Sequence, residues 1–205
     1  MTTEVHVLTE RAAALTREGN LTGARDCCMA ALEQDPGRLA TYVSLGQVSH
    51  LMSNQNLAVR CYLAAMHLQA AAVERQLREQ TLSVQLQSLL AAFPAELLEE
   101  LPRTSAFIVF ADPHLPRHAA HALADLSRDT MRQQEDLAPY ADAYRAQLNG
   151  NGTHEQVLAR NGLTVNDQIR KDKDWYIPIG RQFFLDQLKW DRAESAEVLR
   201  IYFPS

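Results

Sequence analysis

The densest group of side chains that could bind a metal ion surrounds three histidines in the second half of the chain. His118, His121 and Asp125 are spaced three and four residues apart, which places them on one face of a helix. His114 and Asp112 come just before them in the sequence. Imidazole and carboxylate groups together suit zinc or iron. Because no His-Glu-x-x-His motif is present, the sequence favours a structural role for these residues, with a metal site as the alternative.

Other motifs of catalysis are missing from the sequence. No Gly-x-Ser-x-Gly turn, phosphate-binding loop or dinucleotide fingerprint is present. Cys27, Cys28 and Cys61 form no Cys-x-x-Cys pair, and adjacent side chains on a helix point about 100° apart. We expect these cysteines to be buried, reduced thiols. The sequence therefore predicts no catalytic residues and no cofactor.

The composition indicates a soluble globular protein. Of 205 residues, 46% are hydrophobic and 22% are charged, which suits one or two folded domains. The net charge of −5 provides no positive field for a nucleic acid or an anionic membrane surface. Residues 1–10 lack the pattern of a secretory signal, and no apolar stretch approaches the ~20 residues of a membrane span. We therefore expect a cytoplasmic protein, and its Arg-rich basic set favours a GC-rich bacterial genome.

Side-chain volumes recur every 34 residues in the first third of the chain. Apolar residues at helical spacing predict helices over 4–18 and 21–34, then over 39–52 and 55–69. Turn residues separate the helices of each pair at Gly19-Asn20 and Ser53-Asn54. The elements that would position a site are therefore two successive helical hairpins. The aligned pairs are Leu8 with Tyr42, Ala12 with Gly46, Ala24 with Ala58, Cys28 with Tyr62, and Ala31 with Ala65.

These aligned residues resemble the tetratricopeptide repeat family over about residues 5–70. Tyr42, Leu45 and Gly46 stand where the family has a large residue, Leu and a small residue in the first helix of a unit. The resemblance implies that small residues let helices approach closely while bulky residues fill the remaining gap. An ordinary antiparallel bundle is the alternative. The departures from the family pattern are Arg11 for Leu, Ser49 for an aromatic residue and Ala70 for Pro.

Two repeat units alone would leave an apolar end uncovered, because stacked repeats need about three units and a cap. Residues 71–93 have a long helical pattern, Pro94 ends it, and 95–101 suits a short second helix. We expect this pair to be a degenerate third unit or a cap, which extends the repeat domain to residue 102. Gln80 stands where the family has Gly or Ala.

The resemblance implies that the first helix of each unit lines a concave surface that binds an extended peptide or a helix of another protein. Family members that hold a terminal carboxylate use cationic and amide side chains there, and no matching position carries Lys, Arg or Asn. We therefore expect an apolar or amphipathic ligand. A merely solvated surface, or one covered by the C-terminal half, is the alternative. By position, the lining residues are His6, Thr9, Ala13, Thr16, Ala40, Val43, Gln47, His50, Glu74, Leu77, Thr81 and Val84.

The second half of the chain differs in composition. Of two Trp, six Tyr and six Phe, only Tyr42, Tyr62 and Phe93 precede residue 103, so a separate core is expected over 103–205. The apolar run 106–111 predicts a short strand. Aromatic residues that alternate with charges near the end of the sequence indicate a docked C-terminal cap. Helices are expected from Pro116 onward, over 137–148, after a Thr153–Gln156 capping box, and over 164–169.

The sequence thus predicts an all-α or nearly all-α protein with a repeat domain at 1–102 and a helical, aromatic-rich region at 103–205. Its predicted function is a protein–protein interaction scaffold, an adaptor or chaperone that binds a peptide or amphipathic helix of a partner protein. A small secretion-type chaperone is one specific version. The alternatives are an enzyme with a metal site in the C-terminal half, to which the repeats recruit substrate, and self-association into a homo-oligomer.

Overall fold

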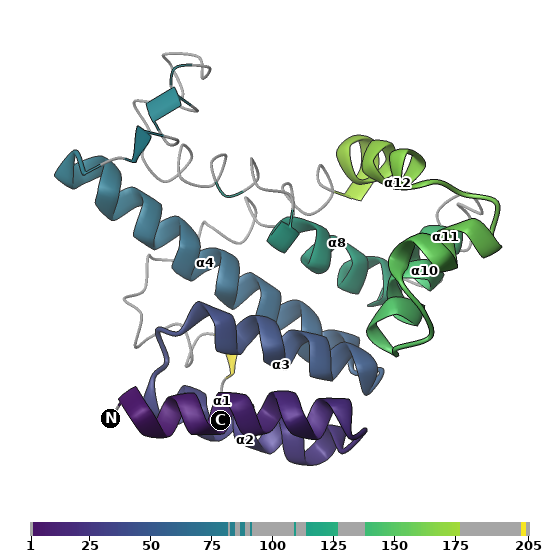
Figure 1. Ribbon diagram of the computed structural model, residues 1–205. Coiled ribbons are helices and arrows are strands. Elements are labelled where there is room, and N and C mark those ends of the chain that lie inside the picture. Colours follow the sequence, from purple (N-terminus) through teal and green to yellow (C-terminus); the bar gives the residue numbers. More distant parts are fainter. Residues whose placement is uncertain are drawn as a thin grey trace.

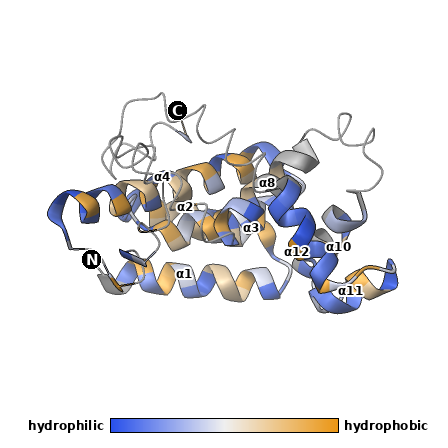
Figure 2. Cartoon of the chain, turned by 90° about the horizontal axis from the view of Figure 1, so that it is seen from above, coloured by the Kyte–Doolittle hydropathy of each residue, from blue (hydrophilic) through white to orange (hydrophobic). Residues whose placement is uncertain are grey.

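The computed structural model describes residues 2–81, 83–84, 87–88, 91, 109, 114–126, 138–176 and 202–203. Every element within these ranges is a helix, which confirms the predicted all-α fold (Figure 1). Among the described helices, none combines the length and the apolar character needed to cross a membrane. Figure 2 shows hydrophobic residues concentrated where α2, α3 and α4 meet, while α12 is mainly hydrophilic.

The first four helices form two hairpins close to the predicted boundaries. Helix α1 spans Thr2–Arg17 and packs against α2, Leu21–Gln34. Helix α3 spans Leu39–Leu51 and packs against α4, Gln55–Glu79. Contacts between α2 and α3 join the two hairpins. In Figure 1, α1 and α3 lie in front of α2 and α4.

The turns of the two hairpins repeat one geometry 34 residues apart. The Asn20 side-chain oxygen accepts from the Gly23 N–H at 3.0 Å, and the Asn54 oxygen accepts from the Leu57 N–H at 3.2 Å. The residue before each Asn has positive φ, 80° at Gly19 and 59° at Ser53. These side chains satisfy N–H groups that the first helical turn leaves unbonded. The predicted turns are therefore confirmed, and the internal repeat extends to their hydrogen bonds.

Small residues let the helices of the hairpins approach closely, as the repeat pattern predicts. Ala24, Ala58 and Ala65 are completely buried. A Cβ atom added at Gly46 would lie 2.6 Å from a ring carbon of Tyr62. Because real Cβ atoms do not approach that closely, glycine at this position is what allows α3 to pack against the Tyr62 ring.

Helix α4 continues past the expected end of the second hairpin. The prediction of a helix over 55–69, followed by a separate helix from 71, is wrong because α4 runs unbroken to Glu79. The family's Pro is absent at Ala70, and Ala71 and Ala72 are strong helix formers. The helix ends at Gln80, whose φ of 54° closes the last turn. The expected break at Pro94 and the helix over 95–101 lie outside the described residues.

The first helix described in the C-terminal half packs on the repeat. Helix α8, His114–Leu126, lies along α4, with Leu115, Ala119 and Ala122 buried in the same core as the hairpins. Of the segment 106–111 only Val109 is described, and its backbone is helical; the rest of the expected strand lies outside the described residues.

Three short helices and one π-helical turn complete the described part of the chain. Helix α10, Ala138–Leu148, contacts α3 and α8. It packs on α11, His154–Arg160, through a second small core that includes Tyr140 and Leu158. Helix α12, Val165–Lys171, runs into the π-helical turn η1, Asp172–Tyr176, which contacts α8. The predicted capping box of Thr153 with Gln156 is confirmed.

Candidate functional site

The groove residues expected on α1 lie at its accessible side. Ala13 is exposed. His6 is also exposed, with Nε2 3.4 Å from a carboxylate oxygen of Glu10. The Thr9 hydroxyl donates to the carbonyl oxygen of His6 at 2.8 Å, and the Thr16 hydroxyl donates to the carbonyl oxygen of Ala12 at 2.8 Å. The α1 row therefore offers a small side chain and hydroxyls that are already hydrogen-bonded within the helix.

The groove residues expected on α3 occupy the same repeat positions one unit later. Ala40 is exposed, while Val43 and Gln47 are half-buried. Val43 also packs against the main core. Because α1 and α3 contact each other, the two rows lie on adjacent helices, and Ala13 and Ala40 are not covered by the described part of the C-terminal half. We call Thr9, Ala13, Ala40, Val43 and Gln47 the α1–α3 surface.

The third set of expected groove residues lies on or just beyond α4. Leu77 is half-buried, and Thr81 and Val84 are exposed. Glu74 is buried and accepts two hydrogen bonds from the Arg78 guanidinium, at 2.7 and 3.1 Å. Glu74 and Leu77 belong to α4, the partner helix of α3, and therefore do not lie on a separate first helix of a third unit.

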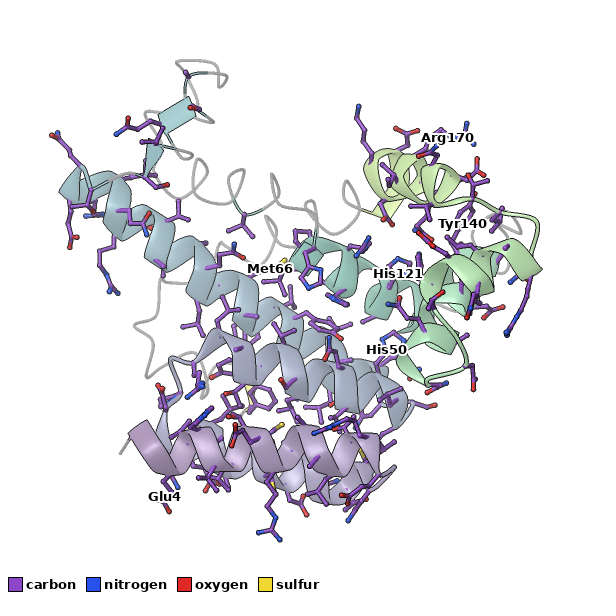
Figure 3. The ribbon with its side chains drawn as sticks, in the orientation of Figure 1. Glu4, His50, Met66, His121, Tyr140 and Arg170 are labelled. Carbon is purple, nitrogen blue, oxygen red and sulfur yellow. The ribbon has the colours of Figure 1, made fainter. Side chains whose placement is uncertain are left out.

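His50 differs from the other groove candidates because it is only 2% exposed. It lies in the last turn of α3 and is close enough to His118 on α8 to contribute to the lowering of that residue's pKa. The structure therefore brings His50, predicted as a groove residue, close to the histidines of α8 that were the alternative metal site. Figure 3 labels His50 and, on α8, His121.

The ring of His118 contacts two other rings where α8 packs on α4. The His118 ring stacks on Tyr62 with 5.5 Å between ring centroids, and His114 meets its edge at 4.6 Å. Burial, together with the charges of His114, Arg117, His121 and His50, lowers the pKa of His118 to about 3. His118 is therefore neutral at pH 7 and acts as an aromatic packing residue.

A buried carboxylate joins the other side of α8 to η1. Asp172 accepts a hydrogen bond from Gln168 Nε2 at 2.6 Å and one from Arg117 Nη1 at 3.3 Å. His121 Nε2 lies 3.6 Å from the same carboxylate. These donors compensate the burial of the negative charge. The arrangement fixes α8 against the end of α12. No local sequence pattern marks the contact between α8 and η1, because Arg117 is 55 residues from Asp172 along the chain.

The described residues of the alternative metal site do not form a set of ligands. Within the part of the chain that the structure describes, no three His, Cys, Asp or Glu side chains are placed to hold a metal ion. His118 stacks on Tyr62, and His121 faces Asp172. The side chain of Asp125 lies outside the described residues. The described geometry therefore provides no ligand set for the metal-dependent enzyme that was the alternative function.

The cysteines have the properties of core residues. Cys28 and Cys61 are buried and Cys27 is half-buried, all three as free thiols. Burial, with a smaller contribution from Cys27, raises the pKa of the Cys28 thiol to about 11. Burial, with a smaller contribution from Cys28, also raises the pKa of Cys61. Because the thiolate is the reactive form, neither residue is a nucleophile at neutral pH.

Two aromatic residues near the end of the sequence contact the repeat helices. Tyr202 is 5% exposed, and its ring meets the edge of His67 with 6.0 Å between centroids. The Tyr202 hydroxyl lies 3.3 Å from His67 Nδ1. Phe203 packs on the main core, with its ring 6.1 Å from that of Tyr42. The sequence indicated a docked C-terminal cap, but not that α3 and α4 would receive it.

Comparisons of the chain with protein-family models, with curated proteins and with solved structures found no match. The features of the chain that bear on its function are the repeat, the α1–α3 surface and the contacts that support them.

Proposed function

We propose that this chain is a protein-binding scaffold of the tetratricopeptide type, an adaptor or chaperone that holds a segment of a partner protein against the α1–α3 surface. The observation that carries the proposal is the repetition of the same turn and the same lining positions 34 residues apart. Two hairpins related in this way place equivalent side chains on adjacent first helices, as in repeat proteins that bind extended ligands.

The side chains of the surface favour an apolar or amphipathic segment. Ala13 and Ala40 are exposed and small, so a partner can approach the helix backbones. The hydroxyl of Thr9 already donates within α1, so an apolar ligand that covers it leaves no unpaired donor. No cationic side chain belongs to the α1–α3 surface, which disfavours a carboxylate or phosphate as the main anchor.

The rigidity of the surface also supports a binding role. Both helices begin or end in hydrogen-bonded turns, and their inner faces are fixed by completely buried residues such as Leu45. A partner that binds there orders few additional residues of the scaffold. The entropic cost of association is therefore confined mainly to the partner.

Substitution of the two exposed alanines tests the proposal. Ala13→Arg and Ala40→Arg place long charged side chains on the surface without filling the core, because both positions are exposed. We expect the double variant to keep its circular dichroism spectrum and melting temperature. Partner recovery in affinity purification with mass spectrometry should fall at least tenfold.

Ala159→Arg is the matched control, since Ala159 is exposed on α11. The control should recover the partner like the unmodified chain. Equal recovery by the double variant, with its fold intact, would rule out the α1–α3 surface as the binding site.

A cytoplasmic secretion-type chaperone is the specific version that we propose. Such a chaperone shields an apolar segment of a substrate until export. The substrate is therefore expected to have a shorter half-life in cells that lack this chain, and a pulse-chase measurement tests it. An unchanged half-life of a protein that binds the α1–α3 surface would favour an adaptor over a chaperone.

A further inference from the structure

We propose that the hairpins carry a second peptide site, formed by α3 and α4, that takes an adjacent tyrosine and phenylalanine, and that the chain's own Tyr202 and Phe203 occupy it. The site uses Tyr42 and His67, which are not part of the α1–α3 surface. The inference is therefore independent of the proposed function.

The contacts to the Tyr202 side chain are specific for tyrosine. Its ring stands at 86° to the His67 ring, and its hydroxyl reaches His67 Nδ1 at 3.3 Å. His67 belongs to α4 and is itself only 6% exposed. A phenylalanine in this place would leave the imidazole nitrogen without that hydrogen bond inside the protein, which is unfavourable.

The contacts to the Phe203 side chain are apolar. Its ring lies 6.1 Å from the ring of Tyr42 at an angle of 33°, and it packs against the main core while staying half-buried. The Tyr42 hydroxyl donates elsewhere, to the carbonyl oxygen of Pro36 at 2.9 Å. Tyr42 therefore presents ring surface rather than a polar group to the aromatic side chain beside it.

The turns of the hairpins do not involve this aromatic pair. The side-chain caps of α2 and α4 are made by residues within 20–57. The pair joins a core to which α8 also contributes, and it reaches that core from a part of the chain outside both hairpins. It lies 135 residues away from His67 in the sequence.

Occupation by the same chain would keep other peptides of this kind out. A ligand joined to its own site binds intramolecularly, with an effective concentration that reaches the order of mM for a short flexible connection. A separate peptide with the same affinity would have to exceed that concentration to displace it. The site is thus closed to a partner's tyrosine–phenylalanine segment until Tyr202 and Phe203 are released.

The test uses the full chain and a labelled peptide. The peptide AEVLRIYFPS, residues 196–205, carries a fluorophore at its N-terminus, and binding is followed by fluorescence anisotropy. We expect Tyr202→Ala/Phe203→Ala to bind the peptide at least tenfold more tightly than the unmodified chain does. A peptide with alanine at both aromatic positions should bind neither protein.

Substitution of His67 provides a second test of the same site. In the Tyr202→Ala/Phe203→Ala background, His67→Ala should weaken peptide binding severalfold, whereas His6→Ala, at an exposed histidine of α1, should not change it. Equal binding by the His67 and His6 variants would contradict the assigned site.

Folding is checked by circular dichroism and thermal melting. If the double variant loses its helical signal, the Phe203→Ala single variant is tested with the same peptide and should also bind more tightly than the unmodified chain. Unfolding of both variants, or no peptide binding by a folded variant, would overturn the proposal. A wild-type dimer in light scattering that the double variant converts to a monomer would overturn occupation by the same chain.

Discussion

At the scale of single residues, the closest contact between helices involves Gly46 and Tyr62. Glycine is needed here because a Cβ atom would clash with the Tyr62 ring. The backbone conformation does not require it, since φ at Gly46 is not positive. Replacement of Gly46 by alanine distinguishes packing from helix propensity. Overpacking against Tyr62 would lower the free energy of unfolding, whereas the better helix propensity of alanine would raise it.

We predict that Gly46→Ala destabilises the protein. The new Cβ would lie 2.6 Å from the Tyr62 ring, and the strain should lower the free energy of unfolding by about 1–3 kcal/mol. Urea denaturation measures the change, with Ser44→Ala on the same helix as a control of small effect. An increase in stability of about 1 kcal/mol, the value expected from helix propensity alone, would show that the helices do not approach this closely.

The buried His118 should make the stability of the protein depend on pH. Its pKa is about 3 in the folded chain, against 6.5 for the unperturbed group. Below pH 6.5 the unfolded chain takes up a proton that the folded chain does not bind. Stability is therefore fully present above pH 6.5 and falls with decreasing pH by up to about 1.4 kcal/mol per pH unit.

His118→Phe is expected to lose less stability between pH 7 and pH 5 than the unmodified chain, because the ring still stacks on Tyr62 but no longer titrates. Part of the pH dependence should persist, since burial also lowers the pKa of His67 and of His154. Ser44→Ala, which removes no titratable group, serves as the control with an unchanged pH profile. Identical profiles for all three proteins would place His118 in contact with water.

At the scale of elements, the two hairpin turns offer a reciprocal test of the 34-residue repeat. Gly19 and Ser53 occupy equivalent positions, both with positive φ. A side chain in this conformation costs about 1–2 kcal/mol, which glycine avoids in part at the expense of greater freedom in the unfolded chain.

We predict that Ser53→Gly raises the free energy of unfolding by about 0.5–1 kcal/mol and that Gly19→Ser lowers it by a similar amount. No atom lies within 4 Å of a Cβ added at Gly19, so the effect of that substitution is conformational. Thermal denaturation of both variants provides the measurement. Changes of the same sign would mean that the two turns are not equivalent.

Local signals in the sequence were sufficient to predict several elements. Asn20 and Asn54 mark helix starts because their side chains cap the following turn. Thr153 with Gln156 does the same for α11. The sequence does not predict the continuation of α4, because Ala70 and its neighbours are compatible with either a helix interior or a junction, and only the absent Pro distinguishes the two.

Contacts between distant elements could not be predicted in the same way. The proximity of His50 to His118, and of Asp172 to Arg117, depends on how α8 and η1 pack against the hairpins. Helical spacing places His118 and His121 on one face of α8, but it does not specify what each ring meets. The spacing favours a structural role for these histidines and leaves a metal site as the alternative, but it does not predict the stacked ring and the carboxylate contact that the structure has.

At the scale of the whole molecule, the last repeat helix is covered by the chain's own later segments. Leu115 and Ala119 of α8 are buried against α4, and Tyr202 joins the same core. A helix at the end of a repeat stack needs such a cover to keep its apolar face from water. Ala13 and Ala40 on the first helices are exposed, so the described cover leaves this part of the α1–α3 surface accessible.

The most direct test of the account is photo-crosslinking in cells from single positions on this surface. A photoreactive phenylalanine analogue at residue 13 and, separately, at residue 40 should crosslink to one and the same partner protein. The analogue at residue 159 on α11 should not. Crosslinks from 13 and 40 to unrelated proteins, or equal crosslinking from 159, would contradict a partner held along α1 and α3.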